Sequence, residues 1–241
     1  METETNKTAR EVELRKPAAQ ELGRRRFSVA QLLIALGIFF TCAPFLEEIK
    51  GGDLIVSFLL SLVLLSAVLA VADRRRTLVV AILLAIPTLA ARWVSHFRPD
   101  LVPPGVFLIG GLLLFIFVVA QLLRFVLRAP SVTADVLCAS IAAYLMLGLI
   151  WTIAYWLVAQ LTPGAFAFNT NTGAKETMEG FNAFYFSFVT LSTVGYGDIT
   201  PVSKVARMLA ATEAMTGLFY VAVLIARLVA LYSTPATPKP P

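Results

Sequence analysis

The chain has 241 residues, of which 58% are hydrophobic and 15% are charged, and its mean hydropathy is +0.80. This balance excludes an ordinary soluble domain and indicates an integral membrane protein. The formal net charge of +5 does not indicate a nucleic-acid partner, because the basic residues stand beside apolar blocks, where they orient helices in a bilayer.

The first 26 residues are polar and carry charges of both signs. They lack the apolar core and the small-residue cleavage site of a signal peptide, so we expect residues 1–26 to be a cytoplasmic N-terminal segment. Six apolar blocks follow, each close to the roughly 20 residues that a helix needs to cross a bilayer. The blocks are Phe27–Leu46, Leu54–Ala72, Thr77–Val94, Gly105–Leu127, Val136–Leu161 and Val205–Tyr232.

These blocks predict an all-α membrane protein with six transmembrane helices, because backbone exposed to lipid must satisfy its own hydrogen bonds. Arginine residues at 24–26, at 74–76 and at positions 124 and 128 fall on alternate connections, whereas the connections 47–53 and 95–104 have no basic excess. Basic connections remain on the cytoplasmic side. We therefore expect a multi-pass protein of the cell membrane with both termini in the cytoplasm.

The connection at residues 128–135 divides the chain into two regions. Before it, residues 27–128 form a four-helix peripheral module with few polar groups. After it, residues 134–232 read as a helix, a loop, a short apolar segment, a second loop and a final helix. The short segment Phe181–Leu191 cannot span a bilayer and predicts a re-entrant helix. Residues 233–241 are rich in Pro and Thr and predict a disordered tail.

A hexapeptide follows the re-entrant segment. It consists of Thr193, Val194, Gly195, Tyr196, Gly197 and Asp198. The stretch from Phe181 to Pro201 resembles the pore loop of the potassium channel superfamily, and the resemblance extends over the fifth and sixth helices. In that family, four Thr-Val-Gly-Tyr-Gly loops surround the ion path, and their backbone carbonyls replace the hydration shell of potassium. The segment occurs once here, so the resemblance implies a homotetramer whose pore domain is residues 134–232.

The resemblance also implies roles for the filter residues. The ion would be bound by the backbone carbonyls of Thr193, Val194, Gly195 and Tyr196, together with the Thr193 hydroxyl. The Val194 and Tyr196 side chains would point away from the ion path and brace it. Gly195 and Gly197 suit this arrangement, because aiming successive carbonyls at one axis requires backbone angles that cost other residues about 1–2 kcal/mol. Asp198 would add negative charge at the outer mouth.

Residues around the hexapeptide are expected to support it. The C-terminal end of the re-entrant helix would point towards the ion path, where its partial negative charge favours a cation. Tyr185 and Phe186 would form an aromatic cuff around the filter. Glu213, in the sixth helix, is interpreted as a structural hydrogen-bond partner of the pore helix. Val189 stands where some bacterial members carry Glu, so no carboxylate at that position pairs with Asp198.

The sixth helix resembles an inner gating helix. Gly217 has the spacing from the filter at which many family members have a hinge glycine, although a glycine in a membrane helix also permits close helix packing. Both interpretations remain open. Counting helical turns from Gly217 predicts that Val221, Ile225 and Val229 face the inner pore.

The fourth helix lacks a voltage sensor. In six-helix potassium channels this position often carries Arg at every third residue, whereas the stretch from Gly105 to Gln121 contains no charge. One charge crossing the whole membrane field supplies only about 2.3 kcal/mol per 100 mV. We therefore predict weak or absent voltage dependence.

The function predicted from the sequence is passive, potassium-selective conduction across the cell membrane, with potassium, the lipid bilayer and three further copies of the chain as partners. No enzyme and no cofactor are expected, since a single His and scattered Ser residues give neither a catalytic triad nor a metal cluster. One alternative is a membrane transporter or accessory protein with a structural hairpin, although transporters usually show paired repeats. A less selective cation channel is a second alternative.

Overall fold

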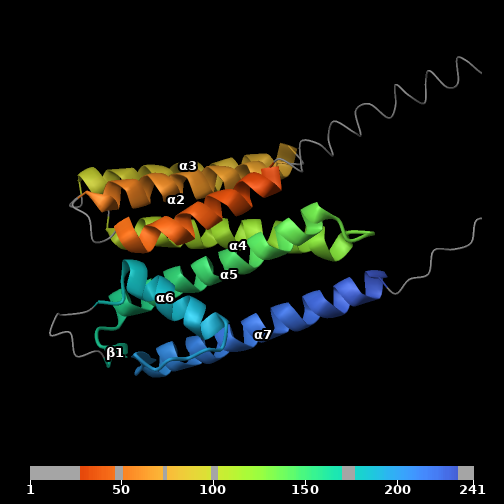
Figure 1. The fold of residues 1–241 in the computed structure, drawn as a ribbon. Helices are drawn as coiled ribbons and strands as arrows, with labels where there is room; N and C mark the ends of the chain where they lie inside the picture. The colour runs from red at the N-terminus through yellow and green to blue at the C-terminus, as the bar shows by residue number, and fades with distance from the viewer. Residues whose placement is uncertain (1–27, 47–50, 73–74, 99–102, 170–176, 233–241) are drawn as a thin grey trace, which may run out of the picture.

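The computed structural model describes residues 28–46, 51–72, 75–98, 103–169 and 177–232. Nearly all of this is helical, and the elements run in the order helix 28–46, α2 to α5, β1, α6, β2 and α7 (Figure 1). The helices after the first are α2 (Gly52–Ala70), α3 (Arg75–Phe97), α4 (Pro104–Arg128), α5 (Ala134–Leu161), α6 (Gly180–Leu191) and α7 (Lys204–Tyr232). The predicted all-α membrane fold is confirmed.

Five of the helices in the described part of the chain are long and apolar enough to cross a membrane. They are Ser28–Leu46, Arg75–Ser95, Gly105–Arg128, Ala134–Leu161 and Lys204–Ala230. The place of the second predicted span is taken by α2, whose apolar stretch Leu54–Ala70 is shorter than those five. Local signals explain two helix starts. α4 begins at Pro104, where proline is preorganised for a first turn, and the Thr133 side chain caps α5 by accepting a hydrogen bond from the Val136 amide (3.4 Å).

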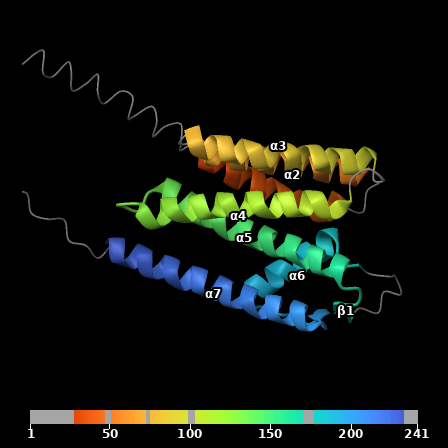
Figure 2. The ribbon, with the colours of Figure 1, turned by 180° about the vertical axis from the view of Figure 1, so that it is seen from behind.

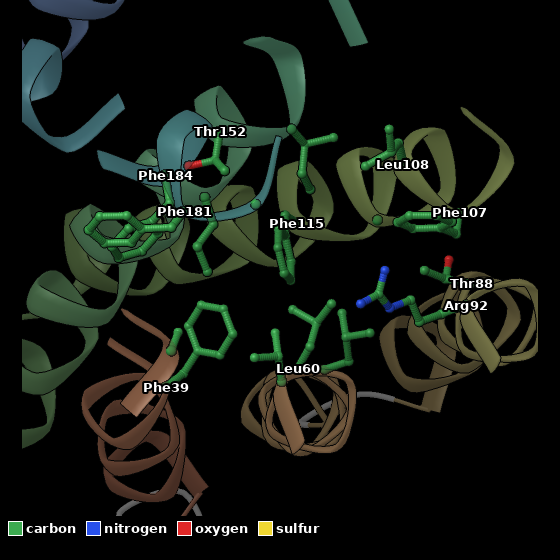
Figure 3. A pocket seen from close by; sticks show the side chains of 17 residues that line it. Phe39, Leu60, Thr88, Arg92, Phe107, Leu108, Phe115, Thr152, Phe181 and Phe184 are labelled. Carbon is green, nitrogen blue, oxygen red and sulfur yellow. The ribbon is translucent and has the colours of Figure 1, made fainter. Parts of the chain in front are cut away.

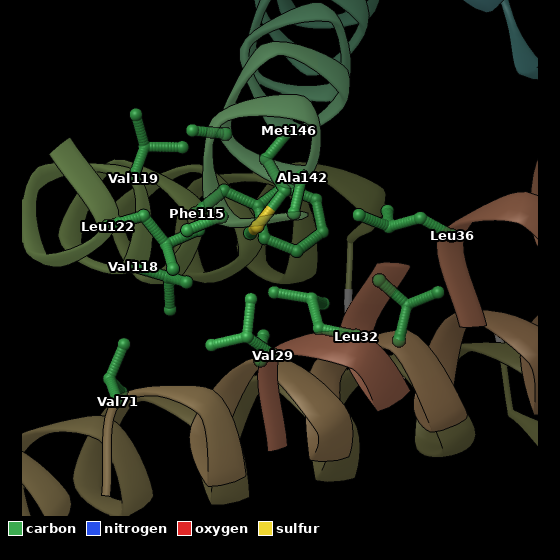
Figure 4. Close-up of a cluster of buried hydrophobic side chains, with 14 of the residues drawn as sticks. Val29, Leu32, Leu36, Val71, Phe115, Val118, Val119, Leu122, Ala142 and Met146 are labelled. Carbon is green, nitrogen blue, oxygen red and sulfur yellow. The ribbon is translucent and has the colours of Figure 1, made fainter. Parts of the chain in front are cut away.

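The long helices lie side by side in a bundle. Helix 28–46, α2 and α3 occupy one side, α4 and α5 the middle, and α7 the opposite edge, with α6 inclined between α5 and α7 (Figures 1 and 2). One hydrophobic core joins the first helix to α4 and α5, where Leu32 and Leu36 approach Phe115, Ala142 and Met146 (Figure 4). The helices before residue 129 and the first part of α5 therefore share one core.

A short antiparallel ladder lies beside α6. β1 (Phe166–Phe168) pairs with β2 (Ile199–Pro201), so that Phe168 is opposite Ile199. The sequence analysis did not predict these strands, because three residues are too few to show the alternation that marks a strand. The ladder ties the segment after α5 to the segment that follows the hexapeptide, and so closes the outer end of the site described next.

Candidate functional site

The pore helix α6 is fixed by a buried polar contact at its centre. The Ser187 hydroxyl donates towards Glu213 Oε1 (2.6 Å) and towards the Gly148 carbonyl (2.8 Å), and the Tyr155 hydroxyl donates to Glu213 Oε2. Glu213 and Ser187 are completely buried. The hydrogen bond expected between Glu213 and the pore helix thus forms within one subunit. Because an unpaired buried carboxyl is costly in this setting, these contacts fix α6 against both α5 and α7.

The backbone of the hexapeptide turns its N–H groups towards α6. The Val189 carbonyl accepts hydrogen bonds from the amides of Val194 (2.9 Å) and Gly195 (3.3 Å), and the Thr190 carbonyl accepts one from Thr193 (2.9 Å). In a trans peptide the N–H and C=O groups point in opposite directions. The carbonyls of Thr193 and Val194 therefore point away from α6, towards the uncovered side of the chain.

Every second residue of the hexapeptide has a left-handed backbone. The φ angles are 60° at Thr193, 60° at Gly195 and 83° at Gly197. Alternation of left-handed and right-handed residues keeps successive peptide groups facing the same side. Within the described ranges, Thr193 is the one residue other than glycine with a positive φ. That conformation costs about 1–2 kcal/mol, which marks this backbone as held in place by its surroundings.

The outer end of the hexapeptide is held by residues from other segments. The Asn169 side chain donates to the Gly197 carbonyl (2.8 Å), and its backbone amide donates to the Asp198 carbonyl (2.7 Å). The Tyr185 hydroxyl donates to Asp198 Oδ2 (2.7 Å), and Asp198 Oδ1 accepts from the Ile199 amide (3.0 Å). The Gly197 carbonyl is thus engaged by Asn169, whereas the Thr193 and Val194 carbonyls face the uncovered side.

The Tyr185 hydroxyl remains a hydrogen-bond donor at neutral pH. The hydrogen bond to Asp198, followed by burial and the nearby charge, raises the pKa of Tyr185 to about 12. Its neighbour Phe186 faces another direction and packs against Tyr155 and Phe166, with ring centroids 4.8 Å and 5.6 Å away. Of the expected aromatic cuff, Tyr185 thus reaches the outer end of the filter, whereas Phe186 packs α6 against α5 and β1.

Gly217 has a packing reason to be glycine. A Cβ at this position would collide with the carbonyl oxygen of Leu191, at the end of α6. α7 continues as one helix through this point. Gly217 was interpreted above either as a hinge or as a site of close helix packing. The structure supplies the contact that close packing requires.

The predicted pore-facing row is uncovered in a single chain. Val221, Ile225 and Val229 have exposed fractions of 43%, 56% and 57%. Val194 and Tyr196, in the hexapeptide, are exposed at 53% and 71%, so one chain alone does not brace the hexapeptide through these two side chains.

Arg227, near the C-terminal end of α7, donates from Nη2 to the Ala129 carbonyl (2.9 Å) in the connection between α4 and α5.

Asn169 is the functional candidate that sequence reasoning missed. It lies in the loop expected between the fifth helix and the re-entrant segment, and asparagine in a loop usually bonds to nearby backbone. Its contact is instead with Gly197, 28 residues away. Its place at the start of the sequence Asn169-Thr170-Asn171-Thr172 does not identify a long-range partner.

The comparisons with known proteins concern this same region. A family model described as "Ion channel" matches residues 144–234. The voltage-gated potassium channel Kch of Escherichia coli strain K12 is 46% identical over 59 residues, which are 21% of this chain and 14% of that protein. Two pore potassium channel b of Oryza sativa subsp. japonica is 33% identical over 87 residues, 36% of this chain and 21% of that protein. Two-pore potassium channel 4 of Arabidopsis thaliana is 40% identical over 62 residues, 26% and 22% of the two chains.

The matched region begins within α5 and contains α6, the hexapeptide and all of α7. The chain spans between 14% and 22% of the length of these three relatives. No solved structure is significantly similar to it. Residues 144–234 are therefore similar to an ion channel family, and segments of the chain are similar to parts of potassium channels.

Proposed function

We propose that the chain is one subunit of a homotetrameric, potassium-selective channel that conducts passively through a filter at Thr193 to Asp198. The observation that carries this proposal is the direction of the filter amides. The amides of Val194 and Gly195 are occupied by the Val189 carbonyl, so their partner carbonyls face the open side in a row. Such a row of neutral oxygens can replace the hydration shell of a potassium ion.

The surrounding charges favour a cation at this row. The C-terminal end of α6 directs its partial negative charge towards the hexapeptide. Asp198 stands at the outer end, oriented by Tyr185. Both features raise the local concentration of cations without placing a full charge beside the bound ion, so an ion binds and also leaves.

The uncovered surfaces support assembly from four copies. One chain leaves the filter and most of α7 exposed, including Met208 (65%), Leu218 (61%) and Phe219 (63%). A closed ring of identical subunits covers such surfaces and places four filters around one axis. In this assembly Val221, Ile225 and Val229 line an apolar inner vestibule, and Gly217 sets the distance between α7 and the end of α6.

The same proposal covers the location and voltage response. The subunit is a multi-pass protein of the cell membrane with both termini in the cytoplasm, as the alternating basic connections indicate. Voltage dependence is weak or absent, since α4 is uncharged between Gly105 and Gln121. In α3, Arg92 is engaged by the Ser57 hydroxyl (2.9 Å) and by the ring of Phe107.

Flux from proteoliposomes tests the proposed function. We expect the purified protein to pass potassium down its gradient and to pass sodium much more slowly. The variants Gly195→Ala and Gly197→Ala are expected to abolish potassium flux while the assembly stays intact, because a Cβ strains the left-handed backbone that aims the carbonyls.

A matched control separates filter damage from general strain. Gly164 also has a left-handed backbone (φ 75°), and it lies in the loop after α5 with open space where a Cβ would stand. Gly164→Ala should therefore leave potassium flux nearly unchanged. Equal passage of sodium and potassium would favour a less selective cation channel. Potassium movement that requires a second ion gradient would favour a transporter.

A further inference from the structure

A cavity of about 120 Å³ lies between the peripheral helices and the pore helix (Figure 3). Phe39 of the first helix, Leu60 of α2 and Phe115 of α4 point into it, and Phe181 and Phe184 of α6 close it on the pore side. Some lining residues, among them Ala43 and Phe181, are only partly buried. The cavity is therefore not completely enclosed by this chain.

The lining offers hydrocarbon contacts rather than hydrogen bonds. Its two hydroxyls are already used within their own helices, where Thr88 donates to the Leu84 carbonyl (2.7 Å) and Thr152 donates to the Gly148 carbonyl (2.8 Å). Arg92 of α3 also lines the cavity, and its guanidinium donates to Ser57 (2.9 Å) and lies 5.0 Å from the ring centre of Phe107 (Figure 3). Water requires two to four polar partners in a cavity, whereas an apolar cavity of about 150 Å³ stays dry and accepts benzene.

The wall formed by α6 connects this cavity to the filter. Phe184 also packs against Phe40 of the first helix, with ring centroids 4.8 Å apart, and Phe40 packs against Phe188 at 4.7 Å. Directly after Phe188, Val189 and Thr190 of the same helix supply the carbonyls that accept hydrogen bonds from the filter amides. A molecule in the cavity therefore contacts α6, the helix that holds the hexapeptide amides.

We propose that the end of an acyl chain from a bilayer lipid occupies this cavity, and that the first helices hold this chain against α6 to support the filter. A straight hydrocarbon end fits the size, the dry lining and the partly open rim, and it removes the cost of an empty cavity inside a packed bundle. The supporting effect on conduction rests on the proposed channel function, whereas occupation of the cavity does not.

Photolabelling of the purified full chain tests the site. The protein is placed in vesicles of phosphatidylcholine and phosphatidylglycerol that contain phosphatidylcholine with a diazirine at the end of one acyl chain. After irradiation, mass spectrometry measures the label on the peptide that contains Phe181 and Phe184. We expect this peptide to be labelled well above the average of the lipid-facing helices.

Filling the cavity should remove that label. Leu60→Trp places a large ring in the space, and Ala43→Leu fills the rim with a smaller change in case the first variant folds poorly. Each is expected to lower the label on the α6 peptide several-fold and to reduce potassium flux at equal protein content. The matched control is Leu65→Trp on the same helix, at a position 55% exposed, which should change neither result.

The two measurements separate the two claims. Labelling needs no conduction, so it tests the cavity even if the purified protein passes no potassium. An α6 peptide labelled no more than the other helices, or equally in Leu60→Trp and the unmodified protein, overturns the acyl-chain site, and a side chain of a second copy is then the better occupant. Loss of label in a conducting protein whose flux stays unchanged overturns the supporting role.

Discussion

Gly217 shows how one missing side chain positions the pore helix. α7 passes the end of α6 so closely that a Cβ at residue 217 would meet the Leu191 carbonyl oxygen. This oxygen belongs to the last residue of α6, two residues before Thr193, so a displacement there would act on the end of α6 that holds the hexapeptide. Glycine at this position is therefore explained by contact, and no bend of α7 is needed to account for it.

We predict that Gly217→Ala lowers both stability and conduction. Overpacking of this kind typically costs about 1–3 kcal/mol, and a rigid backbone partner favours the upper end of that range. Thermal unfolding of the purified protein and potassium flux would measure the two effects. The control is Gly37→Ala, in a helix where a Cβ meets open space, and it should stabilise slightly. A Gly217→Ala protein with unchanged unfolding temperature but altered gating would instead support a hinge.

The residues of the filter differ in how far the sequence could predict them. The positions and left-handed glycines of the hexapeptide were predicted, because the motif itself carries the backbone requirement. The left-handed Thr193 and the role of Asn169 were not predicted. Both depend on partners outside the motif, namely the end of α6 and a loop 28 residues earlier. Backbone requirements within a motif can be predicted from the sequence, whereas contacts from segments far away in the chain cannot.

At the scale of elements, helix positions were easier to predict than helix contacts. The pore helix was expected at Phe181–Leu191 and is observed at Gly180–Leu191, because its apolar run is bounded by a glycine and by the filter. The contact of Phe40 with Phe184 and Phe188 was not predicted. A helix that is apolar on every side has no stripe that indicates its packing face, so sequence alone does not assign its neighbours.

Arg227 links two elements at the inner end of the bundle. Its Nη2 donates to the Ala129 carbonyl, which joins α7 to the connection between α4 and α5. Hydrogen bonds of charged groups contribute about 1.5–3 kcal/mol when they are buried and less when they are partly exposed. This contact therefore restrains the inner end of α7, where the predicted vestibule residues lie.

We predict that Arg227→Met loosens this end of the helix. In a background without Cys42 and Cys138, Ile225→Cys should react with a cytoplasmic thiol reagent, and the reaction should become several-fold faster when Arg227 is also changed. Arg124→Met, an exposed basic position near the same end of α4, is the control and should not alter the rate. A Cys at 225 that never reacts would contradict its place in the vestibule, and a rate unaffected by Arg227→Met would contradict the restraint.

At the scale of the whole molecule, one chain alone does not enclose the ion path of the proposed channel. Its filter carbonyls face an open side, and most of the surface of α7 is exposed apolar side chain. Some of that surface faces the central axis and some must contact the neighbouring copy or lipid. Residues two positions apart in a helix point in nearly opposite directions. Phe219 therefore lies on a different side of α7 from Val221. We therefore place Phe219 at the contact between subunits.

We predict that the purified protein in mild detergent has four times the 26.2 kDa mass of one chain, and that Phe219→Ala weakens this assembly. Truncating a buried aromatic residue at an interface often costs about 2 kcal/mol, whereas the same change on a lipid-facing surface costs little. Leu83→Ala on α3, where the side chain is 70% exposed, provides the lipid-facing control. Native mass spectrometry at rising detergent concentration would measure the fraction of separated chains. A two-chain or single-chain mass for the conducting protein would contradict the fourfold arrangement, and equal dissociation of both variants would place Phe219 in lipid.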